Sequence, residues 1–570
     1  MMLDSLLYWS DSEVLYRIIS FGLLALLAIL VIWPAATNKT GRMGAAFFVL
    51  VLCAFVILAR WPGLFYPRGF NPDEDQFVAA ARALVLDPVF FRATEAGSSG
   101  PLNVYPLLAS LLAGVWPTLF SARLVGLAMI CGALVAVYCA GRAVFSEPVA
   151  RFGALLPGVF FGLTNYWDFT HYTSEHMPMA ILAWGAAMSL WALARPEMTF
   201  SRRVAVACLA ACLFSLVPFA KLQAAMAAVV YSGILVAGVA LYGSCWRQKV
   251  GGIAIVCVAG ILLPIALMVF FVFNGVFDYF WKSYILNALA YQGSGYQGQS
   301  AWQMLGMILF AFPPNHPIDF LWFSTGWLAL MCLGGAALLC FRRRSVPWRV
   351  WGVFAYMVLV IGLAIWTVTA PQRNYPHYLL FLPIPMGMFS MALLGLIDEK
   401  LVQRGATSRL VLIVLAVIGA LGPMLVWRTM SPNSWAGLAQ NWSKEEKGLI
   451  AKKLLEVSQG EGRLCVWGYN PTLYTETGLL QATRLSTSSG LFNDNALRSF
   501  FLATYIDDLQ RNRPLVFVDA VAPDQFVMMT KREEHGHEKI PEIRDFVAAN
   551  YTLFEEIDGV RIYKWKEGQP

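Results

Sequence analysis

The sequence predicts a polytopic α-helical membrane protein that carries a small α/β domain at its C-terminus. Of the 570 residues, 58% are hydrophobic and only 14% are charged, so one water-soluble core cannot bury all the apolar side chains. Many apolar runs are long enough for a helix of about twenty residues, which crosses a hydrocarbon layer. Charged residues become frequent only after Trp427, where the composition is that of an ordinary soluble domain.

About twelve transmembrane helices are expected, one for each apolar run. The runs lie near residues 15–34, 44–62, 121–144, 152–167, 178–194, 204–219, 222–242, 251–273, 318–340, 349–369, 376–396 and 409–428. Asp4, Asp11 and Glu13 precede the first run and no small-residue cleavage pattern ends it, so we expect a retained anchor rather than a signal peptide. Together these runs define a transmembrane domain of residues 1–428.

Basic residues set the orientation of the helices. Arginine and lysine prefer the cytoplasmic side of short loops, and here every second connection is basic. The residues are Lys39, Arg42, Arg142, Arg151, Arg195, Arg202, Arg203, Arg247, Lys249, Arg342, Arg343, Arg344, Arg349, Lys400, Arg404 and Arg409. The alternation requires the apolar stretch Val104–Trp116 to lie along the outer interface instead of crossing. The long outer loops are then 61–120 and 274–317.

Residues 429–570 are expected to form the α/β domain. Helical patterns at Lys444–Val457 and Leu497–Leu509 alternate with short β-like runs at Leu464–Trp467, Leu515–Val518 and Val560–Trp565. The number of predicted crossings places this domain on the outer side of the membrane.

Composition argues against two other classes of protein. The ten cysteines lie mostly in apolar runs and lack zinc-site spacing, so neither a disulfide framework nor a zinc site is expected. The formal net charge is +7, but the basic residues are spread over short loops, which does not indicate nucleic-acid binding.

Three consecutive acids, Asp73, Glu74 and Asp75, open a helical pattern in the first outer loop. Acids at a helix start complement its dipole, and capping accounts for one or two of them. Because carboxylates are costly near a membrane, the cluster favours a functional site.

Further polar residues stand at the outer ends of other apolar runs. Glu175 and His176 open one helix, where they would reach water or supply acid/base chemistry or cation ligands. Lys221 lies between two apolar runs, either as a lysine that reaches toward water or as a fixed cation for a phosphate group. Arg373, with His377 and Tyr378 behind it, is suited to hold phosphate by two parallel hydrogen bonds.

With these motifs the chain resembles the superfamily C (GT-C) glycosyltransferases, in particular bacterial relatives of the protein O-mannosyltransferases and the aminoarabinose lipid A transferase. The resemblance covers most of the membrane part and the start of the C-terminal domain. It rests on Asp73-Glu74, Gly100-Pro101-Leu102-Asn103-Val104-Tyr105, Ser121-Ala122-Arg123-Leu124-Val125, Glu175 with Pro178, Lys221, Pro376-His377-Tyr378-Leu379-Leu380, and Val466-Trp467-Gly468-Tyr469-Asn470-Pro471. The element ending at Tyr105 lacks the lysine that the family has there.

The resemblance implies an inverting transfer of a sugar from a polyprenyl-phosphate donor to a cell-envelope acceptor, which is a lipid, a glycan or a protein. The enzyme would lie in the bacterial inner membrane, with its active site and C-terminal domain in the periplasm. Catalysis is expected from Asp73 and Glu74, with Asp73 as general base or acceptor-orienting group. The expected phosphate-binding residues are Lys221, Arg373, His377 and Tyr378, and a substrate or second acidic site is expected from Asp75, Tyr105, Glu175 and His176.

The metal requirement and the function each have alternatives that the sequence allows. A divalent cation, Mg²⁺ or Mn²⁺, held by Asp73, Glu175 and His176 and a metal-free site are equally compatible with the residues present. The alternative functions are a flippase or transporter of lipid-linked glycans, and a polymerase or ligase of such glycans. A transporter should show mid-membrane charges and repeated halves, and a polymerase should show arginines in a large outer loop, where Asn274–Pro317 has Lys282 as its only basic residue. The sugar, the acceptor, the linkage and the oligomeric state do not follow from the sequence.

Overall fold

The computed structural model describes residues 13–37, 42–95, 97–293, 295–296, 298–310, 317–341, 348–401, 406–430, 447–492, 496–523 and 529–566. Of the basic residues that predict the orientation, Lys39, residues 342–344 and Arg404 lie outside these ranges, as does the start of the helix predicted from Lys444.

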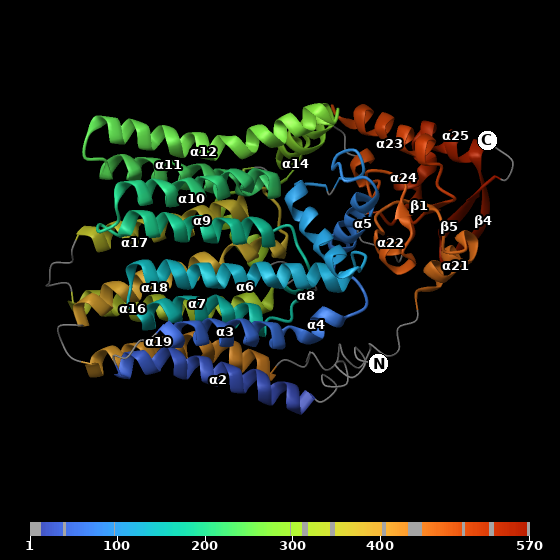
Figure 1. Ribbon diagram of the computed structural model, residues 1–570. Coiled ribbons are helices and arrows are strands. Elements are labelled where there is room, and N and C mark those ends of the chain that lie inside the picture. Colours follow the sequence, from blue (N-terminus) through green and yellow to red (C-terminus); the bar gives the residue numbers. More distant parts are fainter. Residues whose placement is uncertain are drawn as a thin grey trace.

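Twelve long helices of the described chain run side by side in one bundle (Figure 1). They are α2 (Glu13–Thr37), α3 (Arg42–Ala59), α6 (Leu119–Val144), α7 (Glu147–Leu163), α9 (His176–Ala194), α10 (Phe200–Ala220), α11 (Ala225–Tyr242), α12 (Trp246–Phe273), α16 (Ile318–Phe341), α17 (Trp348–Thr369), α18 (Pro383–Leu401) and α19 (Ala406–Met430). Within the described residues, eight spans are long and apolar enough to cross a membrane, and α2, α3 and α19 contain shorter apolar stretches. The predicted fold class of a multi-pass helical membrane protein is confirmed.

Helix α7 forms the centre of one half of the bundle. All 17 of its residues are buried, against α3, α6 and α18. Small residues allow this close approach, since a methyl group added at Gly153 would overlap the side chain of Met391. The charge of Glu147 is balanced inside the bundle by Arg151, whose Nε lies 2.8 Å from Oε1.

Short elements cover one end of the bundle. They are α4 (Trp61–Phe65), α5 (Pro72–Leu86), η1 (Pro101–Asn103), η2 (Tyr105–Ala113), α8 (Trp167–Thr170), η3 (Leu222–Ala224), α13 (Phe277–Tyr279), η4 (Phe280–Leu286), α14 (Asn287–Gly293), α15 (Ala301–Leu309) and η5 (Pro376–Phe381). The stretch predicted to lie along the interface forms the short 3₁₀-helix η2, with Leu112 and Trp116 exposed. It is too short to cross a membrane, as the orientation rule requires.

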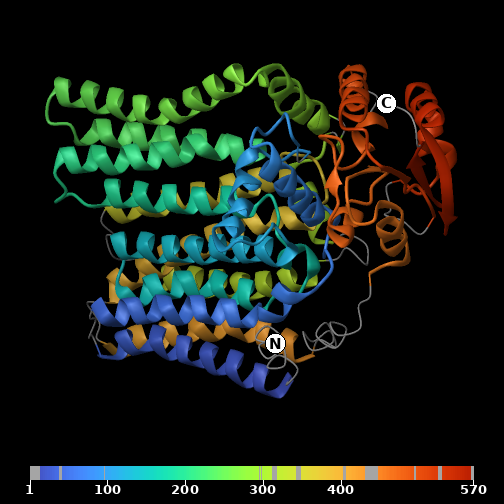
Figure 2. The same ribbon diagram turned by 45° about the vertical axis from the view of Figure 1, so that its right-hand side comes forward.

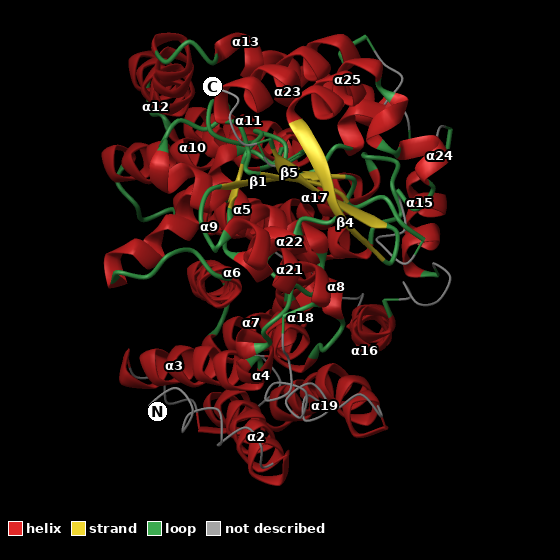
Figure 3. Ribbon diagram, turned by 90° about the vertical axis from the view of Figure 1, so that its right-hand side faces the viewer, coloured by secondary structure: helices red, strands yellow, loops and turns green. Residues whose placement is uncertain are grey.

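The C-terminal domain contains a five-stranded sheet with helices around it (Figure 3). The strand order is β2-β1-β3-β5-β4, in which β1 pairs in parallel with β2 and β3, and β5 pairs antiparallel with β3 and β4. The strands are β1 (Arg463–Trp467), β2 (Leu480–Gln481), β3 (Val516–Asp519), β4 (Tyr551–Ile557) and β5 (Val560–Trp565), and the helices are α21 (Leu449–Ser458), α22 (Thr472–Thr477), η7 (Ser489–Phe492), α23 (Arg498–Asn512), α24 (Arg532–His535), η8 (His537–Lys539) and α25 (Pro541–Asn550). The three predicted strands correspond to β1, β3 and β5.

This domain packs directly on the covered end of the bundle, with α5 between the two (Figure 2). Ala79 of α5 is buried in the same apolar cluster as Leu454 and Leu473 of the domain. At a second contact, the rings of Tyr279 and Phe500 lie 5.4 Å apart. The end of the bundle and the domain therefore share a continuous interior, which is where the predicted site residues gather.

Candidate active site

Helix α5 begins at a well-defined cap that fixes the three acids in its first turn. The side chain of Asn71 accepts a hydrogen bond from the backbone N–H of Asp73 at 3.0 Å, and Pro72 occupies the first helical position. Successive residues of a helix point about 100° apart. The three carboxylates consequently face three different surroundings.

Asp73 faces the junction between the bundle and the C-terminal domain. Its side chain is half-buried, and its Oδ1 accepts hydrogen bonds from the hydroxyl of Tyr469 at 3.1 Å and from Nε2 of Gln76 at 3.3 Å. Tyr469 follows strand β1 of the C-terminal domain. Asp73 is thus a partly accessible carboxylate in contact with both parts of the protein.

Glu74 points into the interior of the bundle. Its side chain is fully buried and pairs with Arg123, with Nε–Oε1 at 2.9 Å and Nη2–Oε2 at 2.7 Å. The backbone N–H of Tyr172 donates a further bond to Oε1 at 3.0 Å. Protein groups engage both carboxylate oxygens, which is the environment of a structural ion pair, and the catalytic role of Glu74 stays a prediction.

Asp75 binds the C-terminal domain. Its carboxylate accepts hydrogen bonds from the hydroxyl groups of Thr472, at 2.9 Å, and Thr475. Burial is the main cause that raises the pKa of Asp75 to about 7. Asp75 joins α5 to α22 through these bonds, and its predicted part in a substrate or second acidic site stays a prediction.

Lys221 and Glu175 form a buried ion pair at the same end of the bundle. Nζ of Lys221 contacts Oε1 of Glu175 and the hydroxyl of Ser174, and it lies 5.0 Å from the ring centre of Tyr378. Burial alone would raise the pKa of Glu175, but Lys221 and His377 outweigh it and hold this pKa at about 2. Lys221 is therefore a fixed cation beside an aromatic face.

Asp168, which the sequence analysis did not single out, also belongs to this group. Its Oδ1 accepts a hydrogen bond from Nδ2 of Asn71 at 2.9 Å, and its Oδ2 lies 3.9 Å from Nδ1 of His377. Although burial acts to raise the pKa of Asp168, His377 and Asn71 lower it overall. The signal for Asp168 was an acid in the second outer connection, and its link to the cap of α5 was not visible in the sequence.

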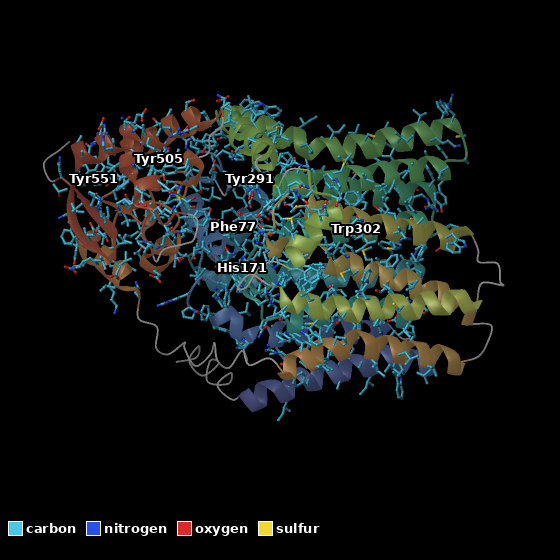
Figure 4. The ribbon with its side chains drawn as sticks, turned by 180° about the vertical axis from the view of Figure 1, so that it is seen from behind. Phe77, His171, Tyr291, Trp302, Tyr505 and Tyr551 are labelled. Carbon is cyan, nitrogen blue, oxygen red and sulfur yellow. The ribbon has the colours of Figure 1, made fainter. Side chains whose placement is uncertain are left out.

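Aromatic residues surround the remaining predicted cation, Arg373. Its guanidinium lies 4.2 Å from the ring centre of Tyr291, and Nη2 donates to the carbonyl of Tyr291 at 3.0 Å. Burial, and then the nearby Tyr375 and Asp73, raise the pKa of Tyr291. Figure 4 shows Tyr291 where the bundle meets the C-terminal domain. Arg373 and Asp73 therefore approach the same group of tyrosines.

No protein-family model and no curated protein matches this chain. Among solved structures, ArnT from Cupriavidus metallidurans bound to undecaprenyl phosphate is similar, with a TM-score of 0.56 and 12% identity over 92% of this chain and 99% of the ArnT chain. The apo state of the same protein gives a TM-score of 0.52 and 12% identity over 91% of this chain and 98% of that chain. The chain has the GT-C fold.

Tyr105 and His176, two more of the predicted site residues, each contact neighbouring residues of this GT-C fold. The hydroxyl of Tyr105 donates to the carbonyl of Pro88 at 2.8 Å, so this side chain anchors η2 to a neighbouring turn. His176 is buried, stacks on Tyr172 with ring centres 5.8 Å apart, and directs Nδ1 at Thr173. The part of Tyr105 and His176 in a substrate or second acidic site stays a prediction.

The predicted metal ligands Asp73, Glu175 and His176 do not come together as a compact group. Among the described residues, only one group of three or more ligating side chains has its ligand atoms within 4.8 Å of one another, and that group lies in the C-terminal domain. Oε1 of Glu175 is paired with Lys221, and Nδ1 of His176 accepts a hydrogen bond from the N–H of Thr173 at 3.0 Å. The residues therefore fit Mg²⁺ or Mn²⁺ poorly, and we derive no step through a metal.

The group in the C-terminal domain is an ion-pair network. It consists of Asp519, His537 and Glu538. Arg532 donates to Oδ2 of Asp519 at 2.7 Å, and Arg561 donates to Oε1 of Glu538 at 2.7 Å. Two guanidinium groups already neutralise these carboxylates and would repel a cation.

Proposed function

We propose that this protein is an inverting glycosyltransferase that moves a sugar from a polyprenyl-phosphate donor to a cell-envelope acceptor. The reaction would take place on the periplasmic face of a bacterial inner membrane. One observation carries the proposal: the partly accessible carboxylate of Asp73 interacts electrostatically with Tyr291 and Tyr378, the tyrosines that face the cations Arg373 and Lys221. The likeness to ArnT, whose structure was solved with undecaprenyl phosphate, supports a lipid-linked donor.

The chemistry is a single displacement at the anomeric carbon of the sugar. An acceptor hydroxyl forms the new C–O bond while Asp73 takes its proton, and the bond between the anomeric carbon and the phosphate oxygen breaks. The electron pair of that bond leaves with the polyprenyl phosphate. Attack from the face opposite the leaving group inverts the configuration of the anomeric carbon.

The cations stabilise the charge that develops on the leaving phosphate. An ammonium group has three N–H donors. Among the described residues, Lys221 directs its hydrogen bonds at Glu175 and Ser174, which leaves one donor for a phosphate oxygen. Arg373 adds a planar guanidinium that suits two parallel hydrogen bonds to phosphate. His377 and Tyr378 would orient these groups, since their rings contact each other with centres 4.8 Å apart.

The test is transfer of radiolabelled sugar by the purified protein. A panel of undecaprenyl-phosphate sugars is offered with cell-envelope extract as acceptor, and Asp73→Asn is compared with the unmodified protein. Asp278→Asn is the matched control, because Asp278 is an exposed acid that pairs with Lys282 on α13 and η4. We expect transfer with the control and none with Asp73→Asn. Folded protein that transfers no sugar from any donor would contradict the proposal and favour a flippase.

A further inference from the structure

Tyr469 is the point at which the C-terminal domain reaches the proposed base. The residue before it, Gly468, has a φ of +102°, a backbone conformation that residues with a side chain rarely adopt. Its N–H donates to the hydroxyl of Ser488 at 2.7 Å, and the N–H of Ser488 donates to its carbonyl at 3.0 Å. The chain leaving β1 is therefore held in one direction, and that direction brings Tyr469 to α5.

The hydrogen-bond pattern determines where the proton of the Tyr469 hydroxyl goes. Nε2 of Gln76 donates to the Tyr469 oxygen at 3.0 Å, so this oxygen acts as an acceptor toward Gln76. The hydroxyl has a single proton, and its oxygen lies 3.1 Å from Oδ1 of Asp73. Tyr469 accordingly accepts from Gln76 and donates to Asp73.

Both hydrogen bonds to the Asp73 carboxylate end on the same oxygen. Within the described chain, Tyr469 and Gln76 donate to Oδ1, and Oδ2 is left for an incoming hydroxyl. Two donors on one oxygen fix the rotation of the carboxylate. A general base needs this orientation before the acceptor arrives.

We propose that Tyr469 is a positioning residue for Asp73, so that the C-terminal domain completes the active site of the membrane domain. The inference rests on the proposed function of Asp73 as base. It gives the docked domain a role in catalysis rather than in acceptor recognition alone.

The contacts on either side of Tyr469 support this role. Thr472 and Thr475, a few residues further along, bind Asp75, which is two positions after Asp73. Nη1 of Arg82 on α5 donates to the carbonyl of Tyr474 at 2.9 Å. One side of α5 is thus matched to the chain from 469 to 475, and the bond to Asp73 depends on this docking.

The test uses Tyr469→Phe in the full-length protein, which keeps the ring and removes the hydroxyl. We expect kcat to fall roughly ten- to hundredfold, as for loss of one hydrogen bond to a charged group, while KM for the undecaprenyl-phosphate sugar stays constant. The acidic limb of kcat against pH should move to higher pH, because a carboxylate that loses a hydrogen bond holds its proton more tightly. Purely structural damage would not move this limb.

Tyr551→Phe is the matched control. Tyr551 is buried, its hydroxyl donates to the carbonyl of Pro514 at 2.8 Å, and Figure 4 shows it on the far side of the C-terminal domain. This variant should keep the kcat and the pH profile of the unmodified protein. Unchanged kcat and pH limb in Tyr469→Phe, or equal changes in both variants, would overturn the inference.

A second readout does not depend on transfer. Difference infrared spectroscopy, with Asp73→Asn to identify the band, reports the carboxylate stretch of Asp73. We expect Tyr469→Phe to shift this band, and an unshifted band would overturn the inference even in an active enzyme. A shifted band in a protein that transfers no sugar would support the contact and contradict the proposed function instead.

Discussion

The substitution Glu74→Gln separates a structural role of Glu74 from a catalytic one. The carboxylate is fully buried and makes two hydrogen bonds with the guanidinium of Arg123, whose own exposed fraction is 3%. Glutamine has nearly the same shape but no charge. The variant therefore leaves the guanidinium of Arg123 buried without its counter-ion.

The expected cost follows from the remaining partners of Arg123. Removing one member of a buried ion pair costs about 3–5 kcal/mol in the free energy of unfolding. In the variant, Arg123 still donates to three backbone carbonyl groups, those of Gly63 at 3.1 Å, of Arg68 at 2.6 Å and of Tyr66. These bonds place the expected loss of unfolding free energy near the lower end of that range. At about 2 °C per kcal/mol for a large domain, a loss of about 3 kcal/mol lowers the Tm by roughly 6 °C.

The assay combines thermal unfolding in detergent with sugar transfer. The double variant Glu74→Leu/Arg123→Met replaces the pair with apolar side chains, an exchange that is often neutral or stabilising. We expect it to restore the Tm and much of the transfer that Glu74→Gln loses. A Glu74→Gln protein with unchanged Tm and no transfer, or a stable double variant without transfer, would refute the structural role and return Glu74 to the chemistry.

Three further predictions concern the ion pair, the docking and the topology. Lys221→Met should raise KM for the undecaprenyl-phosphate donor at least tenfold, because it removes a phosphate contact, with acceptor KM unchanged in steady-state assays. Between pH 4 and 7 the Tm of the unmodified protein should fall relative to that of Asp75→Asn, since burial raises the pKa of Asp75 from 3.8 to about 7. Ionising Asp75 in the docked state costs about 4 kcal/mol, and Asp75→Asn removes this cost. Ser98→Cys in a cysteine-free background should react with an impermeant thiol reagent in intact cells, since Ser98 is exposed and loop 61–120 is predicted to lie on the outer side.

Each of these predictions has an outcome that would contradict it. A change in acceptor KM alone for Lys221→Met would remove the lysine from phosphate binding. A slope of Tm against pH that Asp75→Asn leaves unchanged would mean that Asp75 is not protonated in the docked state. Labelling of Ser98→Cys only after the cells are opened would reverse the predicted orientation.

Much of the fold was predictable because it depends on local patterns. Apolar runs located the twelve long helices, and alternation with helical segments located β1, β3 and β5. Strand β2 has only two residues, and three successive residues of β4, Thr552, Leu553 and Phe554, are exposed, so neither has the apolar alternation of a half-buried strand.

The candidate site was only partly predictable because its contacts join distant segments. Asp73 stood out by its neighbours in the chain, but its bond to Tyr469 spans 396 positions. Asp168 meets Asn71 over 97 positions, and Arg123 meets Glu74 over 49. Local spacing contains no information on such pairings, so the partners of Glu74 and Asp75 could not be predicted from the sequence.

The three acids of α5 show why a cluster in sequence is a poor guide to a cluster in space. Neighbouring side chains on a helix diverge by about 100°, so three successive positions cover most of its circumference. Here Asp73 faces the junction with the tyrosines, Glu74 faces Arg123 inside the bundle, and Asp75 faces the hydroxyl groups of α22. The pair of Glu74 and Arg123 anchors α5 in the bundle, and the hydrogen bonds of Asp75 to α22 set the distance of α5 from the C-terminal domain. Both contacts therefore act on the position of Asp73, and the one acid left partly accessible is the one that the other two hold in place.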